Sequence, residues 1–175
     1  MRLLILSLVL FLTGCANGSG RDAVPLETVE GLEIDRYLGK WYEIGRLPFR
    51  VQEGCVATTA TYTRIDEKHI RVMNECRQER FDGKLRRASA RAWVAGDDPA
   101  RLKVQFFWPF RADYWVIALD PEYRWAMVGQ PSRKYLWILA REPQIPEAVY
   151  LDLLERAAAQ GYDVSRMQRT PQPPS

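Results

Sequence analysis

Few residues in this sequence have the types and spacing that catalysis needs. There is one histidine, His69, and there are three cysteines, Cys15, Cys55 and Cys76. The sequence contains no nucleophile elbow, no cluster of metal ligands and no glycine-rich phosphate loop. A single histidine leaves little scope for general-base catalysis. We therefore expect no enzymatic activity, no bound metal and no cofactor.

Two of the cysteines flank a pair of runs that are rich in β-forming residues. Cys55 precedes residues 56–64, Cys76 follows residues 70–74, and residues 65–68 have the composition of a turn. A hairpin centred on this turn places Cys55 opposite Cys76, as a cross-strand disulfide requires. An oxidising compartment, which the leader discussed below indicates, favours such a bond. The spacing therefore predicts a disulfide between the two residues.

The same register assigns the two faces of this hairpin. It pairs Tyr62 with His69 and puts both residues on the outer face. Thr59, Thr61 and Val72 then share the inner face, where small side chains leave room instead of filling it. An outward position of His69 argues against a haem or metal ligand.

The first residues resemble an export signal. Arg2 is followed by an apolar run, residues 3–12, that is too short to act as a stop-transfer helix. Residues 12–15, with the sequence Leu-Thr-Gly-Cys, resemble the lipobox of bacterial lipoproteins. The resemblance implies a signal peptide over residues 1–14 and cleavage before Cys15, whose thiol then receives lipid. Two or more acyl chains, such as palmitate, make this anchoring stable.

The rest of the chain divides into a tether, one folded domain and a tail. By the same resemblance, Ala16 after the cysteine implies sorting to the outer membrane, on its periplasmic side. Residues 15–30 are expected to be a lipidated N-terminus and flexible tether. Residues 31–170 are expected to form the domain, because 175 residues that are 47% hydrophobic fit one core. Residues 171–175 are a proline-rich tail that we expect to be flexible.

The charge of the chain excludes one class of partner. The formal net charge is only +3, and Arg2 in the leader supplies one unit of it. So small an excess argues against a nucleic-acid-binding protein. A local excess of basic residues is compatible with anionic lipid head groups or with a solvated hairpin, and it comprises Arg77, Arg80, Lys84, Arg86, Arg87 and Arg91.

Short alternating runs continue along the chain at regular spacing, which is typical of a meander of antiparallel strands. They bring the expected strands to eight, over residues 38–48, 56–64, 70–74, 87–94, 101–106, 113–119, 124–129 and 134–141. The period then becomes helical after Pro146, with an apolar stripe through Tyr150 and Leu153. We expect one helix over about residues 146–160, packed against the outside of the sheet.

Three segments, residues 39–43, 113–120 and 135–143, resemble the three lipocalin motifs in their usual order. The resemblance covers roughly residues 30–170, and among lipocalins the sequence is most similar to the bacterial outer-membrane lipoprotein group. It implies an all-β fold, an eight-stranded antiparallel up-and-down barrel closed at one end, with one C-terminal helix outside. The motif residues that it marks as structural are Gly39, Trp41, Asp113, Tyr114 and Arg141.

The resemblance also implies a function and a site. Arg141 is expected to lie across Trp41 as a cation–π lid on the closed end. An eight-stranded barrel holds one small ligand, and the resemblance implies a fatty acid or lysophospholipid that the protein carries or stores. With strand alternation, the expected ligand-contacting residues are Trp41 as the floor, Thr59, Thr61, Val72, Ala90, Val104, Phe106, Tyr114, Val116 and Met127.

Two other functions stay open from the sequence. The first is a thiol-dependent isomerase or antioxidant lipocalin that uses Cys55 as a thiolate, which a disulfide with Cys76 would silence. The second is an envelope protein whose barrel is filled and whose outer face, such as the basic hairpin, contacts a partner. The sequence also leaves open whether two barrels pair as a homodimer.

Overall fold

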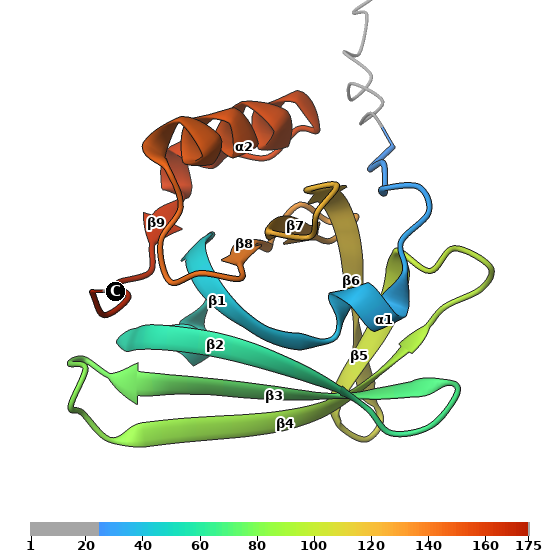
Figure 1. Ribbon diagram of the computed structural model, residues 1–175, viewed down its shortest axis with the longest axis horizontal. Coiled ribbons are helices and arrows are strands. Elements are labelled where there is room, and N and C mark those ends of the chain that lie inside the picture. The colour runs from blue at the N-terminus through green and yellow to red at the C-terminus, as the bar shows by residue number, and fades with distance from the viewer. Residues whose placement is uncertain (1–24, 175) are drawn as a thin grey trace, which may run out of the picture.

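The computed structural model describes residues 25–174. The expected signal peptide over residues 1–14, the lipidation site Cys15 and the start of the tether lie outside the described residues. None of the helices in the described part has the length and apolarity needed to cross a membrane. The elements, drawn in Figure 1, are α1 (Ile34–Tyr37), β1 (Gly39–Arg46), η1 (Arg50–Gln52), β2 (Cys55–Arg64), β3 (His69–Gln78), β4 (Leu85–Val94), β5 (Arg101–Phe107), β6 (Phe110–Leu119), β7 (Trp125–Gly129), β8 (Leu136–Ala140), α2 (Glu147–Ala159), η2 (Val164–Arg166) and β9 (Gln168–Arg169).

The strands form a closed antiparallel barrel, which confirms the predicted fold class. Strands β2 to β8 each pair with their neighbours in the sequence. Strand β1 pairs with β8 on one side and with β2 on the other, and this double pairing closes the sheet. Helix α2 lies outside the barrel, as the helical stripe predicted (Figure 1). Because the strands alternate in direction, the β1–β2, β3–β4, β5–β6 and β7–β8 connections share one end, which we call the mouth.

The C-terminal segment fills the wall where β1 and β2 separate. Strand β1 pairs with β2 only from Gly39 to Tyr42, and farther along it pairs with β9. The Gln172 amide then donates to the backbone oxygens of Glu43 in β1 and Thr58 in β2, at 2.8 and 2.9 Å. Gln172, the second residue of the segment that the sequence assigned to a flexible tail, therefore links two strands.

Buried apolar side chains form two clusters, which the barrel wall separates. The first lies inside the barrel and includes Trp41 and Val116. The second lies between the wall and α2 and includes Ile138 and Leu153. Both clusters are made of residues 26–167, so the barrel with its helix has a core of its own and folds without the leader.

Met127 belongs to the outer cluster, so the prediction that it faces inward is wrong. In β7, Ala126 and Val128 belong to the inner cluster, whereas Met127 packs in the cluster that contains α2. Helix α2 covers the outer face of this strand, so both of its faces are apolar. Alternation of apolar and polar residues then carries no information about which face is inside.

The inner face of β2 was also assigned wrongly. Thr59 and Thr61 alternate with Ala60 and Tyr62, and the latter two belong to the inner cluster. The cross-strand pairing agrees, because Ala60 lies opposite Trp41 in β1. Thr59 and Thr61 therefore face away from the barrel interior, and Tyr62 faces into it.

The error comes from the register of the β2–β3 hairpin. The structure pairs Tyr62 with Val72 instead of with His69. This differs from the predicted register by an odd number of residues, which turns one strand over relative to the other. The Asp66 carboxylate accepts hydrogen bonds from the backbone N–H groups of Lys68 and His69. This side-chain cap stabilises the turn over residues 65–68, about which the observed register is centred.

The contribution of the outer cluster can be tested on α2. Leu153→Ala removes a fully buried side chain and leaves a cavity. We expect it to lower the free energy of unfolding by about 2–5 kcal/mol, measured by urea denaturation. Leu151→Ala, at an exposed position of the same helix, is the matched control and should change stability by less than about 0.5 kcal/mol. Equal losses in the two variants would contradict the packing of α2 through this face.

Candidate functional site

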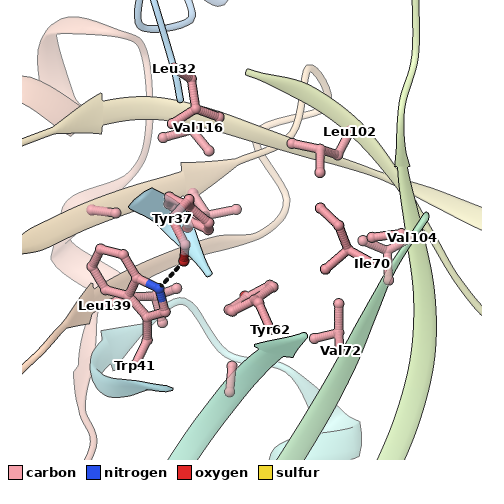
Figure 2. Close-up of a cluster of buried hydrophobic side chains, with 14 of the residues drawn as sticks. Leu32, Tyr37, Trp41, Tyr62, Ile70, Val72, Leu102, Val104, Val116 and Leu139 are labelled. Carbon is pink, nitrogen blue, oxygen red and sulfur yellow. Dashed lines mark hydrogen bonds between the residues drawn. The ribbon is translucent and has the colours of Figure 1, made fainter. Parts of the chain in front are cut away.

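The closed end of the barrel is built around Trp41, whose side chain is fully buried. Its indole Nε1 donates a hydrogen bond to the backbone oxygen of Tyr37 at 2.8 Å (Figure 2). The Arg141 guanidinium lies 3.8 Å from the centre of the Trp41 ring and donates to the backbone oxygens of Lys40 and Arg36. Arg141 therefore ties two neighbouring segments together across the tryptophan.

Two further motif residues support the wall without lining its interior. Gly39 has a φ of 97°, and a Cβ there would lie 3.2 Å from Nη1 of Arg141, so a glycine suits this position for two reasons. The Asp113 carboxylate accepts a hydrogen bond from Lys103 Nζ at 2.6 Å, and its backbone oxygen accepts one from the Gln130 amide. Gly39 and Asp113 therefore have structural positions in the barrel.

Three tyrosine hydroxyls meet inside the barrel beside Trp41. The Tyr114 hydroxyl lies 2.8 Å from that of Tyr37 and 2.6 Å from that of Tyr62. Burial raises the pKa of all three phenols, so the cluster stays neutral. Three hydroxyl protons serve two hydrogen bonds, and the described residues give the third proton no acceptor. The floor of the space above Trp41 is therefore polar.

Apolar side chains line the middle of the barrel. Val72, Val104 and Val116, from β3, β5 and β6, belong to the inner cluster (Figure 2). Ala90 in β4 belongs to the same buried cluster. These four small or β-branched side chains, one from each of the successive strands β3 to β6, fill less volume than leucine or phenylalanine would.

The half of the barrel nearer the mouth is accessible to solvent. Ala88 pairs with Asn74, which alternates with the inward Val72, so Ala88 lies on the inner face of β4. Ala112 pairs with Val104 and lies on the inner face of β6. Both alanines are exposed and Asn74 is half-buried. Exposed inner positions on two walls show that the barrel is open at this end.

A buried polar network lies on the mouth side of β1. The Glu43 carboxylate accepts hydrogen bonds from Thr170 Oγ1 and from the Gln52 amide, each at 2.6 Å. The Gln52 side-chain oxygen accepts one from Trp137 Nε1, and its backbone oxygen accepts one from Arg46. Burial raises the pKa of Glu43, and the two hydrogen bonds with the nearby Arg46 charge oppose that rise. The network holds the β1–β2 connection over part of the mouth.

The predicted disulfide is present at the same end. Cys55 and Cys76 are joined, with their Cα atoms 5.5 Å apart. In the ladder Cys55 pairs with Gln78, so the disulfide joins it diagonally to the residue two positions away, beside an irregularity between Val56 and Thr59. Arg86 donates to the backbone oxygen of Val51 beside this bond. With both sulfurs in the disulfide, neither is a thiolate nucleophile in this structure.

The structure brings together six of the ten predicted ligand-contacting residues. Those in or against the inner cluster are Trp41, Val72, Ala90, Val104, Tyr114 and Val116. The others lie elsewhere: Thr59, Thr61, Met127 and Phe106.

The structure does not place Phe106 in the inner cluster, in which it was expected, and β5 is irregular beside it. The pairing with β6 shifts between Val104 and Phe107, which ends the simple alternation. Phe106 is exposed as a result. A single extra residue in one strand cannot be recognised from a sequence as apolar as this one.

The sequence missed several residues that line the interior. Tyr62 was excluded by the wrong hairpin register. Tyr37 lies on the single turn of α1, where no periodicity is long enough to be detected. Glu43 and Gln52 are polar, and only the burial of Glu43 and its hydrogen bond from Gln52 show that they belong to the site. The described residues contain no group of three or more His, Cys, Asp or Glu side chains placed to hold a metal ion.

A closed eight-stranded barrel with an accessible, mostly apolar interior defines a class of proteins that bind small hydrophobic molecules. The family model described as a lipocalin-like domain matches residues 32–172. The chain belongs to the lipocalin family.

Curated relatives match over most of their length. Temperature-induced lipocalin-1 of Arabidopsis thaliana is 42% identical over 155 residues, which cover 84% of this chain and 83% of that protein. The outer membrane lipoprotein Blc of Escherichia coli (strain K12) is 42% identical over 149 residues, with the same coverage of both chains. Blc of Vibrio cholerae is 36% identical over 166 residues and 94% of each chain. The predicted similarity to bacterial outer-membrane lipocalins is confirmed.

Solved structures support the fold. Lobster apocrustacyanin A1 has a TM-score of 0.65 at 14% identity and covers 80% of this chain and 79% of its own. Insecticyanin from the tobacco hornworm Manduca sexta has a TM-score of 0.65 at 18% identity, with 83% of each chain covered. At this level of identity the likeness shows a shared barrel.

The tyrosine cluster makes a testable prediction about stability. Tyr114→Phe removes the hydroxyl that both hydrogen bonds share. The hydroxyls of Tyr37 and Tyr62 then each lose the hydrogen bond to residue 114. We expect the free energy of unfolding to fall by about 1–3 kcal/mol. Tyr62→Phe keeps the Tyr37–Tyr114 bond and should cost about 0.5–1.5 kcal/mol. Denaturant titration of both variants checks the order, and a larger loss in Tyr62→Phe would contradict a cluster centred on Tyr114.

Proposed function

We propose that the protein is a lipid-anchored lipocalin of the outer membrane that binds a fatty acid or lysophospholipid in its barrel, and carries or stores it. The observation that supports this most directly is the accessible inner surface near the mouth. Ala88 and Ala112 are exposed on inward-facing positions of β4 and β6. A barrel that served only as a rigid scaffold would fill these positions with larger side chains.

An acyl chain suits the space that these residues border. Its walls are apolar through Val72, Val104 and Val116, and its floor is the neutral tyrosine cluster. About eight buried methylenes at about 0.8 kcal/mol each contribute roughly 6 kcal/mol before the costs of association. The net affinity is then nearer to micromolar than to nanomolar, which suits a carrier that must also release its ligand.

Polar groups at the mouth suit the head of such a ligand. Arg86 lies on the inner row of β4 that contains Ala88 and Ala90, beside the disulfide. Its guanidinium reaches the β1–β2 connection through Val51. A carboxylate or phosphate at the mouth would meet this positive charge while the chain lies below.

The anchor is proposed from the sequence and from the relatives. The lipobox-like residues end at Cys15, and the Blc relatives carry the name outer membrane lipoprotein. Acyl chains on Cys15 would hold the barrel close to a source of fatty acids and lysophospholipids. The alternative use of Cys55 as a thiolate has less support, because Cys55 is bonded to Cys76.

Native mass spectrometry tests the carrier function. The chain from Ala16 onward contains the whole core and is measured after delipidation and after addition of lysophospholipid or fatty acid. We expect one lipid per barrel. Ala88→Trp fills the inner face and should abolish binding, whereas Ser89→Trp, one residue along on the outer face, should leave it unchanged. Failure of the unaltered protein to bind any acyl ligand would favour a filled barrel that contacts an envelope partner.

Membrane fractionation tests the anchor separately. The full chain is expressed in a Gram-negative bacterium with labelled palmitate. We expect label in the protein and recovery of the protein with the outer membrane, and Cys15→Ser should abolish both because the lipidated thiol is gone. Cys55→Ser serves as the control for loss of a cysteine elsewhere and should keep the label. Label that survives in Cys15→Ser would contradict the proposed anchor.

A further inference from the structure

The connection between β5 and β6 presents an unusually exposed group of aromatic side chains. In this aromatic tip, residues 106–110, the exposed fractions are 48% for Phe106, 67% for Phe107, 85% for Trp108 and 68% for Phe110. Large apolar side chains gathered on one exposed loop mark a surface that contacts something other than water. The ligand site does not explain them, because they extend beyond the barrel wall.

The aromatic tip is an ordered part of the hairpin. Phe107 and Phe110 pair across the ladder, and their rings pack edge to face with centres 5.5 Å apart. The irregularity in β5 after Val104 lets Phe106 be exposed as well. The tip projects at the lower edge of Figure 1, on the side away from α2. Its exposure is therefore a result of strand pairing and register.

Other connections at the mouth carry exposed apolar side chains too. Phe81 in the β3–β4 turn is exposed, and so is Val51 in η1. Strand direction places both connections at the same end of the barrel as the aromatic tip. Exposed large apolar side chains thus occur on three of the four connections at the mouth.

The charge at this end is positive. The four connections, together with Arg111 at the base of the aromatic tip, carry three acidic residues, Glu53, Glu79 and Asp82. They carry six basic residues, namely Arg50, Arg80, Lys84, Arg111, Arg133 and Lys134. Arg111 is exposed beside the aromatic side chains. A surface of this kind is complementary to a layer that is apolar inside and anionic at its surface.

We propose that the mouth docks on a phospholipid bilayer, with the aromatic tip inserted at the level of the head groups. Tryptophan and phenylalanine beside basic residues are typical of segments that lie in this interface. Pairing of two copies through the mouth is disfavoured, because a two-fold axis would bring two positive surfaces together. This contact is separate from the acyl anchor on Cys15.

The length of chain before the described residues is compatible with such docking. Nine residues lie between Cys15 and Pro25, where the description begins. Fully extended, the ten residue-to-residue steps from Cys15 to Pro25 span at most about 35 Å. This is close to the width of a small domain, so a barrel tethered at Cys15 can bring its mouth to the same bilayer. A lipid could then pass between bilayer and barrel without crossing water.

Vesicle flotation of the unlipidated chain from Ala16 onward tests the proposal, because without acyl groups any binding comes from the protein surface. The vesicles contain phosphatidylethanolamine and phosphatidylglycerol. We expect the unaltered protein to float with them and the double variant Trp108→Ser with Phe110→Ser to bind at least tenfold more weakly. Leu151→Ser, which changes an apolar residue that is 50% exposed on α2, should bind as the unaltered protein does.

Fluorescence gives a second readout that does not depend on disrupting the surface. Trp108→Phe keeps an aromatic ring and should bind vesicles within about twofold of the unaltered protein. Brominated phospholipid should quench part of the tryptophan emission of the unaltered protein and less of that of Trp108→Phe. Equal quenching in the two proteins would overturn insertion of the tip.

Two further outcomes would overturn the proposal. One is a double variant that binds vesicles as tightly as the unaltered protein. The other is a dimer in analytical ultracentrifugation that the double variant abolishes, which would make a second copy the occupant of this surface. The number of lipids bound per barrel is measured on the same samples by native mass spectrometry. This measurement distinguishes a loss of vesicle docking from a loss of the carrier function. A double variant that still binds lipid but not vesicles separates the docking surface from the ligand site.

Discussion

The closure of one end of the barrel by Trp41 is the constraint on which the rest of the site depends. The indole contacts the Tyr37 ring at a centroid distance of 4.9 Å, and Arg141 lies against it at 3.8 Å. The Arg141 guanidinium donates to two backbone oxygens, which compensate its loss of contact with water. Because this end is filled, a ligand can enter the barrel only through the mouth and can reach only as far as the tyrosine cluster.

The fold could be predicted from the sequence because each level of the pattern agreed with the next. Alternating runs gave the strands, their spacing gave a meander, and the change to a helical period after Pro146 gave α2, observed at Glu147–Ala159. The Cys55–Cys76 bond was also predicted, although through a register that the structure does not have. In the observed register Cys55 pairs with Gln78, and the disulfide reaches Cys76 diagonally, with the two Cα atoms 5.5 Å apart.

The candidate site could be predicted only in part, and the misses have physical causes. Alternation identifies an inner face where the outer face is polar, as in β3 and β4, and Val72 and Ala90 were placed correctly. It fails in β7, because α2 covers the outer face of this strand and that face is therefore apolar too. Met127 lies on the outer face instead of the expected inner one. It fails again at Thr59, because the hairpin register differs from the expected one by an odd number of residues. Near Phe106 it is interrupted by the irregular pairing of β5 with β6.

The buried polar network around Glu43 and the aromatic tip lie on opposite walls of the barrel. Strands β1 and β5 are separated by three intervening strands whichever way the sheet is followed. The network of Glu43, Gln52 and Thr170 lies on the β1 side, whereas the aromatic tip continues β5. An amphiphile at the mouth would therefore meet hydrogen-bonding groups on one wall and exposed rings on the other.

This asymmetry also bears on how a ligand could leave a bilayer. With the aromatic tip inserted, the β5 side of the mouth would be at the membrane, where acyl chains are available. The opposite side is held by the buried Glu43–Gln52 contact and by the C-terminal segment between β1 and β2. These contacts make the β1 wall the fixed side of the mouth, because moving it would leave buried polar groups unpaired. Lipid exchange is then expected along β5 and β6, whose connection is exposed.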